Sequence, residues 1–125
     1  MAYGTLAVDT LNSSTGVLAT QNGMTGIAKA WVTFTNSSGT LTINGSFNVS
    51  SLTYRSTGTI GINFTTAMAN SNYALTGTCV TTGTASGVVV IKRSTSTTTA
   101  TDVETVNLTT PLANLTDNSI LIFGA

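Results

Sequence analysis

The stretch from residue 26 to residue 64 alternates between apolar and polar residues, and this pattern constrains the fold more than any other feature. Successive side chains of a β-strand point to opposite faces, so a period of two places the apolar residues on one face, toward a core. Turn signals divide the stretch at Asn36–Gly39, Asn44–Gly45 and Thr57–Gly58. The pattern predicts short antiparallel strands with these inward residues: Ala30, Val32, Phe34, Leu41, Ile43, Phe47, Val49, Leu52, Tyr54, Ile60, Ile62 and Phe64.

The remaining sequence extends this strand pattern. Residues Tyr73–Val80 alternate again, and Asp102–Thr109 resumes the alternation with Val106 and Leu108 expected inward. The run Val88–Ile91 and, after Ser119, the run Ile120–Phe123 are unbroken and apolar, as is typical of strands covered on both faces, here by the core and by another subunit. No segment has the 3.6-residue period of a helix. We therefore expect an all-β fold, an antiparallel, jelly-roll-like β-sandwich of about seven or eight strands.

The chain length of 125 residues fits one domain, preceded by a short arm. Residues 1–25 have too few apolar anchors to fold alone, although Tyr3–Val8 predicts one strand with Leu6 and Val8 on the same face. This arm must lie on its own domain or on a neighbour, or else it forms the first strand of the sandwich. Residues 26–125 are expected to form the β-domain.

The charge content excludes several classes of partner. Only 6% of the residues are charged and the net charge is zero, whereas about 25% is typical of soluble domains. Such a chain lacks the basic surface that nucleic acids and anionic membranes require. Thr, Ser and Asn fill the polar positions, and a neutral, hydroxyl-rich surface can pack against a copy of itself at low desolvation cost. The composition indicates a protein that assembles.

The sequence offers little catalytic chemistry. It contains no histidine, which removes the commonest base near neutral pH and most transition-metal sites. Asp102 and Glu104 are two residues apart on a strand, so they form either a carboxylate pair or ion pairs across a hairpin with Lys92 and Arg93. The single cysteine, Cys79, is interpreted as a small buried filler. We expect no enzyme activity, no catalytic residues, no cofactor and no metal.

Trp31 is the one residue that invites a binding role. It shares a face with Lys29, Thr33 and Thr35, opposite the inward residues of its strand. Three interpretations stay open: a loop or the N-terminal arm covers the indole, the indole contacts another subunit, or it stacks on a sugar ring. Tyr54 and Tyr73 lie on inward registers and are expected in the core.

Several phrases of the sequence resemble a known virion module, the C-terminal domain of tailed-bacteriophage tail-fibre-like proteins. These phrases are Gly26–Phe34, Ser46–Thr53, Gly61–Met68, Asn72–Leu75 and the closing Ile120–Ala125. The opening Gly4–Thr10 resembles the N-terminal segment of several small phage virion proteins. The resemblance covers about four-fifths of the chain and implies a non-enzymatic, all-β, usually trimeric structural protein.

Fibre proteins carry a long shaft before this module, whereas here only some 25 residues precede it. The resemblance therefore favours a homotrimer on the outer surface of a virion, a capsid decoration or cement protein made in the host cytoplasm without a signal peptide. Its partners would be its own copies and the major capsid protein or other virion proteins. The alternatives are the receptor-binding tip of a tail fibre or spike, touching a host surface glycan, and a carbohydrate-binding module. The candidate subunit or capsid contacts are Leu6, Val8, Trp31, Val89, Ile91, Leu121 and Phe123.

Overall fold

The computed structural model describes residues 27–80, 86–107 and 112–124. These residues form eight β-strands and one short 3-10 helix, Arg93–Thr95. The all-β class and the expected number of antiparallel strands are confirmed. The strands are β1 (Ala28–Ser37), β2 (Thr40–Phe47), β3 (Val49–Ser56), β4 (Thr59–Phe64), β5 (Ala74–Val80), β6 (Ser86–Lys92), β7 (Ala100–Asn107) and β8 (Asp117–Phe123).

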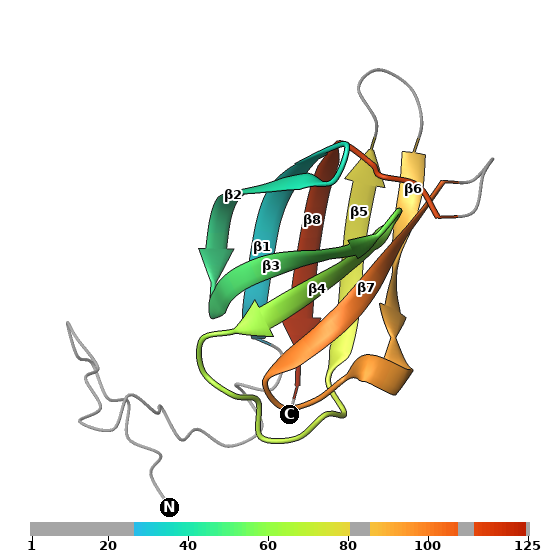
Figure 1. The fold of residues 1–125 in the computed structure, drawn as a ribbon. Coiled ribbons are helices and arrows are strands. Elements are labelled where there is room, and N and C mark those ends of the chain that lie inside the picture. Colours follow the sequence, from blue (N-terminus) through green and yellow to red (C-terminus); the bar gives the residue numbers. More distant parts are fainter. Residues whose placement is uncertain (1–26, 81–85, 108–111, 125) are drawn as a thin grey trace, which may run out of the picture.

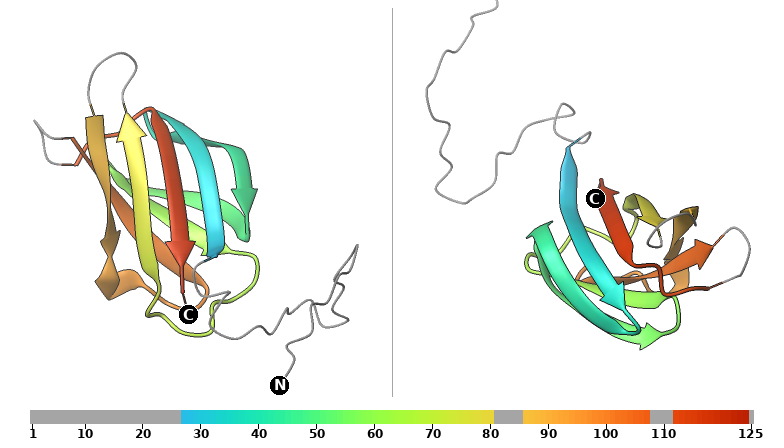
Figure 2. Two further views of the ribbon diagram at one scale, coloured as in Figure 1. Left: turned by 180° about the vertical axis from the view of Figure 1, so that it is seen from behind. Right: turned by 90° about the horizontal axis from the view of Figure 1, so that it is seen from above.

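All eight strands belong to one antiparallel sheet, in the order β2-β1-β8-β5-β6-β7-β4-β3. The sheet curls until its two end strands, β2 and β3, come close together, so that the fold is nearly barrel-shaped (Figure 1). Strands β5, β6 and β7 are consecutive neighbours, and β8 returns to lie beside β5, which is a Greek-key connection. Strand β8 thus lies between β1 and β5, as both views in Figure 2 show.

The core follows the alternation read from the sequence. On β1 the inward residues Ala30, Val32 and Phe34 are at most 1% exposed, while Trp31 between them is 38% exposed. Phe64 and Tyr73 meet edge to face, with ring centroids 5.7 Å apart. The predicted inward positions are confirmed for most of the core, which consists of Ala30, Val32, Phe34, Val49, Ile60, Ile62, Phe64, Met68, Tyr73, Val103, Ile120 and Ile122.

Two of the three predicted turns are confirmed and one is wrong. The chain reverses at Ser38 and Gly39, with φ angles of 51° and 96°, and again at Gly58, with φ 71°. Glycine adopts this left-handed region without a Cβ clash. Asn44 and Gly45, by contrast, lie inside β2, where the β1–β2 register shifts between Thr33 and Phe34. A β-bulge absorbs the residues that the sequence marks as a turn.

The corner between β2 and β3 is the single residue Asn48. Its φ of 54° turns the chain sharply, in a conformation that asparagine tolerates better than most residues. Its side-chain amide donates to the carbonyl oxygens of Lys29 and Thr66, each at 3.1 Å, and its Oδ1 accepts from the Thr66 N–H at 2.7 Å. Asn48 therefore fastens the two end strands of the sheet to the start of β1. Phe47, just before this corner, is 55% exposed instead of inward as predicted, because the bulge at Asn44 and Gly45 shifts the alternation and places Phe47 opposite the outward Trp31.

Asparagines also hold the other end of the barrel together. Asn114 accepts a hydrogen bond from the Gly58 N–H at 2.8 Å and donates one to the Tyr54 hydroxyl at 3.2 Å. Asn36 accepts from the Gly39 N–H at 2.9 Å. These bonds tie the turns after β1 and β3 to the segment that leads into β8.

Candidate interaction surface

Apolar side chains gather on the outward face of β1 and its two neighbours. The strand registers place Trp31 opposite Leu121 of β8 on one side and opposite Phe47 of β2 on the other. Their exposed fractions are 38% for Trp31, 39% for Leu121 and 55% for Phe47. Three large apolar side chains therefore lie side by side in solvent, across three adjacent strands.

The Trp31 indole lies flat over β2 because Gly45 leaves room for it. A Cβ placed on Gly45 would be 3.4 Å from Cζ3 and 3.6 Å from Cη2 of the indole. A side chain larger than alanine at this position would compete with the ring for space. The outer edge of the indole thus lies beside the backbone of Gly45, while 38% of Trp31 stays exposed.

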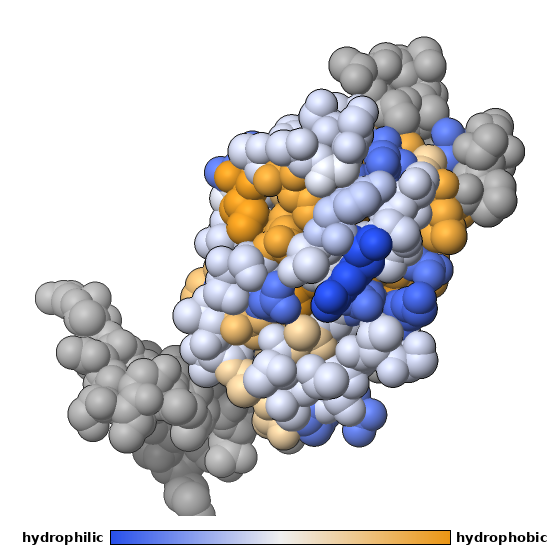
Figure 3. Space-filling view, viewed as in Figure 1, coloured by the Kyte–Doolittle hydropathy of each residue, from blue (hydrophilic) through white to orange (hydrophobic). Residues whose placement is uncertain are grey.

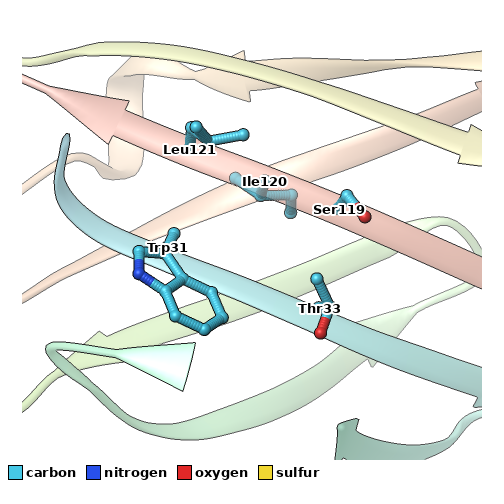
Figure 4. A pocket seen from close by; sticks show the side chains of 5 residues that line it. All are labelled: Trp31, Thr33, Ser119, Ile120 and Leu121. Atoms are coloured by element: carbon cyan, nitrogen blue, oxygen red, sulfur yellow. The ribbon is translucent and has the colours of Figure 1, made fainter. Parts of the chain in front are cut away.

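A shallow hollow of about 420 Å³ lies between β1 and β8, lined by Trp31, Thr33, Ser119, Ile120 and Leu121. Figure 4 shows Trp31, Thr33, Ser119 and Leu121 on the outward side, whereas Ile120 points to the other side of β8. Its side-chain polar groups are the hydroxyls of Thr33 and Ser119 and the indole N–H of Trp31, and no charged residue lines it. The hollow suits an apolar or flat polar surface, and it offers no group for acid–base chemistry.

The same face continues over β5 and β6. Thr76 of β5 pairs with Leu121, and Thr78 pairs with Val88 of β6. Val88 and Val90 are 46% and 45% exposed. Figure 2 shows the five strands side by side from behind. We call this outward side of β2, β1, β8, β5 and β6 the apolar face, with the exposed residues Phe47, Trp31, Leu121, Val88 and Val90.

The predicted contact residues fall into four groups. Trp31 and Leu121 lie together on the apolar face, whereas Val89 and Ile91 are partly buried and pack against the core. Phe123, partly buried, pairs with Ala28 and Ala74 at the end of β8. Leu6 and Val8 lie outside the described residues. Subunit contact stays a prediction for all seven.

Sequence reasoning missed Phe47, Val88 and Val90. The run Val88–Ile91 is apolar at every position, so nothing in it shows which alternate residues point outward. Val106 was expected inward, but that prediction is wrong: it pairs with Val88 and shares the outward register of Glu104, while Val103 and Thr105 are buried. Only the pairing partners settle this register.

The outward side of β3, β4 and β7 has different chemistry, and we call it the ion-paired face. Arg55 Nε lies 3.3 Å from Asp102 Oδ1. Lys92, at the end of β6 where this face borders the apolar face, has its Nζ 3.7 Å from Glu104 Oε1. A Cβ on Gly61 would be 3.0 Å from Asp102 Oδ1, so this glycine leaves room for the ion pair across β4. Figure 3 shows strongly hydrophilic surface over this part of the sheet. Asp102 and Glu104 share a face as predicted, and Glu104 pairs with Lys92, but the partner of Asp102 is Arg55 of β3 rather than a residue of the predicted hairpin.

The Cys79 thiol and the Tyr54 phenol are held by packing and hydrogen bonds. Burial raises the pKa of the Cys79 thiol, whose residue is only 3% exposed, so the predicted buried filler is confirmed. Tyr54 was predicted in the core, but that prediction is wrong: it is 38% exposed, and the hydrogen bond from Asn114 lowers the pKa of its phenol. Within the described ranges, no three His, Cys, Asp or Glu residues come close enough together to hold a metal ion.

Comparison with known proteins adds no relative. No protein-family model, no curated protein and no solved structure matches the chain. In the part of the chain that the structure describes, no helix has the length and apolar character needed to span a membrane.

Proposed function

We propose that this chain is a non-enzymatic structural protein on the outer surface of a tailed-phage virion, a decoration or cement protein that stabilises the capsid shell. The apolar face carries this proposal. Its five large apolar side chains are each 38% to 55% exposed. Contiguous exposed apolar surface is uncommon on soluble monomers and marks sites of protein contact. The resemblance of the sequence phrases to a phage virion module supplies the biological setting.

The chemistry of the apolar face suits permanent contact with protein. Its polar positions are mainly threonine and serine, such as Thr33, Thr76 and Ser119, whose hydroxyls find hydrogen-bond partners readily when they are covered. Covering the part of the face around Phe47, Trp31 and Leu121 removes apolar surface from water at about 25 cal/mol per Å², and the Lys92–Glu104 ion pair lies at the opposite border, beside Val90. A chain of zero net charge also has no long-range repulsion between its copies.

The proposed assembly is a homotrimer of jelly-roll-like, sandwich-like domains. Its subunits contact one another through β6 and β8, where Val88, Val90 and Leu121 are exposed. The N-terminal arm, residues 1–25, holds the domain to its neighbours in the particle. The chain is made in the host cytoplasm, and its further partners are the major capsid protein or other virion proteins.

The test uses capsids of the parent phage that lack this protein. The purified chain should sediment as a trimer, bind these capsids in many copies and raise their melting temperature. Capsids that bind none of it, or that melt at an unchanged temperature when saturated, would refute the decoration role. A chain that sediments as a monomer at all concentrations would refute the trimer.

A second candidate, a carbohydrate-binding module, is favoured by one observation. Trp31 presents an indole face beside the hydroxyls of Thr33 and Ser119, as a stacking platform for a sugar ring would. Against it, the hollow contains no amide or charged side chain to hydrogen-bond sugar hydroxyls. Titration with sugars should leave Trp31 fluorescence unchanged under the structural proposal. A saturable shift that Trp31→Ala abolishes would favour the sugar-binding role instead.

The receptor-binding tip of a tail fibre or spike is the third possibility. It would use the loop at Arg93–Thr101 and that at Thr81–Ser86, most of which lies outside the described residues. Excess purified protein should not block phage adsorption to cells if the chain decorates the shell. Competition for adsorption would favour the tip.

A further inference from the structure

The barrel is open along one side, between its two end strands. Among the described residues, β2 pairs only with β1, and β3 pairs only with β4. Asn48 joins the two strands at one end of this opening. At the other end Tyr54 packs over the turn at Gly39, where an added Cβ would be 3.3 Å from its ring. We call the opening between these two ends the seam.

Residues of the inward register remain uncovered along the seam. Ile43 pairs with the buried Phe34, so it belongs to the inward side of β2, yet it is 38% exposed. Leu41 of β2 and Leu52 of β3 pack against the core and are only partly buried. Figure 3 shows the corresponding apolar area between β2 and β3. One more strand beside β2 would cover these side chains.

The edge of β2 is suited to pairing with such a strand. Exposed edges in soluble proteins usually carry charged residues or proline, which prevent pairing with another chain. Thr40–Phe47 is eight residues long and contains neither. The edge of β3, by contrast, contains Arg55 and two register irregularities. Of the two edges, β2 is the better template for an added strand.

We infer that residues 3–8 of a second copy of this chain occupy the seam as an added strand on β2. This inference rests on the proposed self-assembly and assigns one contact within it. Tyr3–Val8 is uncharged, and its alternation puts Leu6 and Val8 on one face, toward Ile43 and Leu41. Six residues of strand span about 20 Å, within the roughly 26 Å of β2.

The length of the connection points to a second copy. In its own domain the arm would start from β1, which lies directly beside β2, as the pairing of Trp31 with Phe47 shows. A short connection would then suffice, and unstructured loops longer than about 12–15 residues are uncommon within a compact domain. Residues 9–27 separate the predicted strand from β1. Extended, they reach up to about 60 Å, enough to cross to a neighbouring domain.

Cysteine cross-linking of the full chain tests the inference. In a Cys79→Ala background, one chain carries Leu6→Cys or Val8→Cys, and a co-expressed chain carries Leu41→Cys or Ile43→Cys. Mild oxidation should join the two kinds of chain in at least one of the four combinations, and reductant should separate them. Thr5→Cys is the matched control, because its side chain points to the opposite face and should give at least about tenfold less product.

The outcomes separate this inference from the function on which it rests. If only a chain carrying both cysteines cross-links, and does so internally, the arm covers its own seam and the second-copy assignment is wrong. If no combination cross-links while the protein still sediments as a trimer, the inference fails and the proposed assembly stands. A protein that is monomeric in every variant overturns both.

A charge substitution provides a second readout in the full chain. Leu6→Asp should weaken self-association at least about tenfold, because it places a carboxylate against the apolar side chains of the seam. Thr5→Asp adds the same charge on the other face of the strand and should change the strength of self-association less than about threefold. Equal effects of the two substitutions would contradict the proposed orientation of the strand.

Discussion

The apolar face and the ion-paired face are parts of one sheet, yet they carry opposite chemistry. On each, a glycine leaves room for a long side chain to lie across the sheet: Gly45 beneath the Trp31 indole, Gly61 beneath the Arg55–Asp102 pair. The same backbone device therefore presents an aromatic ring on one side and a salt bridge on the other. The difference between the faces comes from the side chains alone.

The difference determines which face can be covered. Burying an ion pair costs desolvation energy that its own attraction repays only with excellent geometry. The 3.7 Å separation of Lys92 and Glu104 is typical of a solvated surface pair. The apolar face gains free energy when it leaves water. The comparison implies that the ion-paired face stays toward solvent while the apolar face meets protein.

The largest expected effect comes from placing a charge on the apolar face. Leu121→Asp should raise the dissociation constant of the assembly at least about 100-fold, because the interface would bury an unpaired carboxylate. The matched control is Ser51→Asp on β3, whose carboxylate can still accept the Asn63 amide hydrogen. It should leave association unchanged. Sedimentation equilibrium measures both, and a Leu121→Asp chain that associates like the parent would remove the apolar face from the interface.

A smaller loss of association is expected from Trp31→Ala. Removing the indole deletes one aromatic anchor without adding a charge, so the dissociation constant should rise about 30-fold. Trp31→Phe keeps an aromatic ring and should lose less than half of that free energy. If the Trp31→Ala and Trp31→Phe variants both associate like the parent in sedimentation, Trp31 lies outside the interface. The sugar-binding alternative then gains weight.

On the ion-paired face the expected effects concern stability and are small. Asp102→Asn and Glu104→Gln should each lower the free energy of unfolding by less than about 1 kcal/mol, as for other exposed pairs. Neither should change association. Urea unfolding gives the first quantity and sedimentation the second. A marked loss of association in either variant would mean that the two faces do not differ as described.

The smallest effect is expected from salt. Association through the apolar face should change less than about threefold between low salt and about 0.5 M NaCl, because few charges take part. The dissociation constant measured by light scattering at several salt concentrations tests this. A tenfold weakening with salt would point to a charged interface instead.

The sequence predicted the strands well because alternation directly reports which side of a strand is buried. The clearest case is β1, where the buried side chains of Ala30, Val32 and Phe34 alternate with the exposed Trp31. All four residues lie as expected. The turns at Gly39 and Gly58 were also predictable, since each requires a positive φ. The outward position of Trp31, and so the centre of the candidate surface, could be predicted from residue spacing alone.

The predictions that were wrong concern features that depend on which strands are neighbours in the sheet. Asn44–Gly45 has the composition of a hairpin turn, but pairing with β1 continues through it with a bulge. That bulge also turns Phe47 outward, opposite Trp31. Asn48 looks unremarkable in sequence, yet its positive φ forms the corner between β2 and β3. The single curled sheet with its seam depends on long-range pairing such as that of β1 with β8, which local pattern does not encode.

The central place of β8 has a consequence for how the domain is made. During synthesis, β1 and β5 leave the ribosome well before the strand that must lie between them, so the sheet cannot join up until Phe123 has emerged. Until then two half-sheets wait with unpaired edges, a state prone to aggregation. Completion of this strand thus acts as a checkpoint: a copy truncated before it could not offer Leu121 beside Trp31 to any partner.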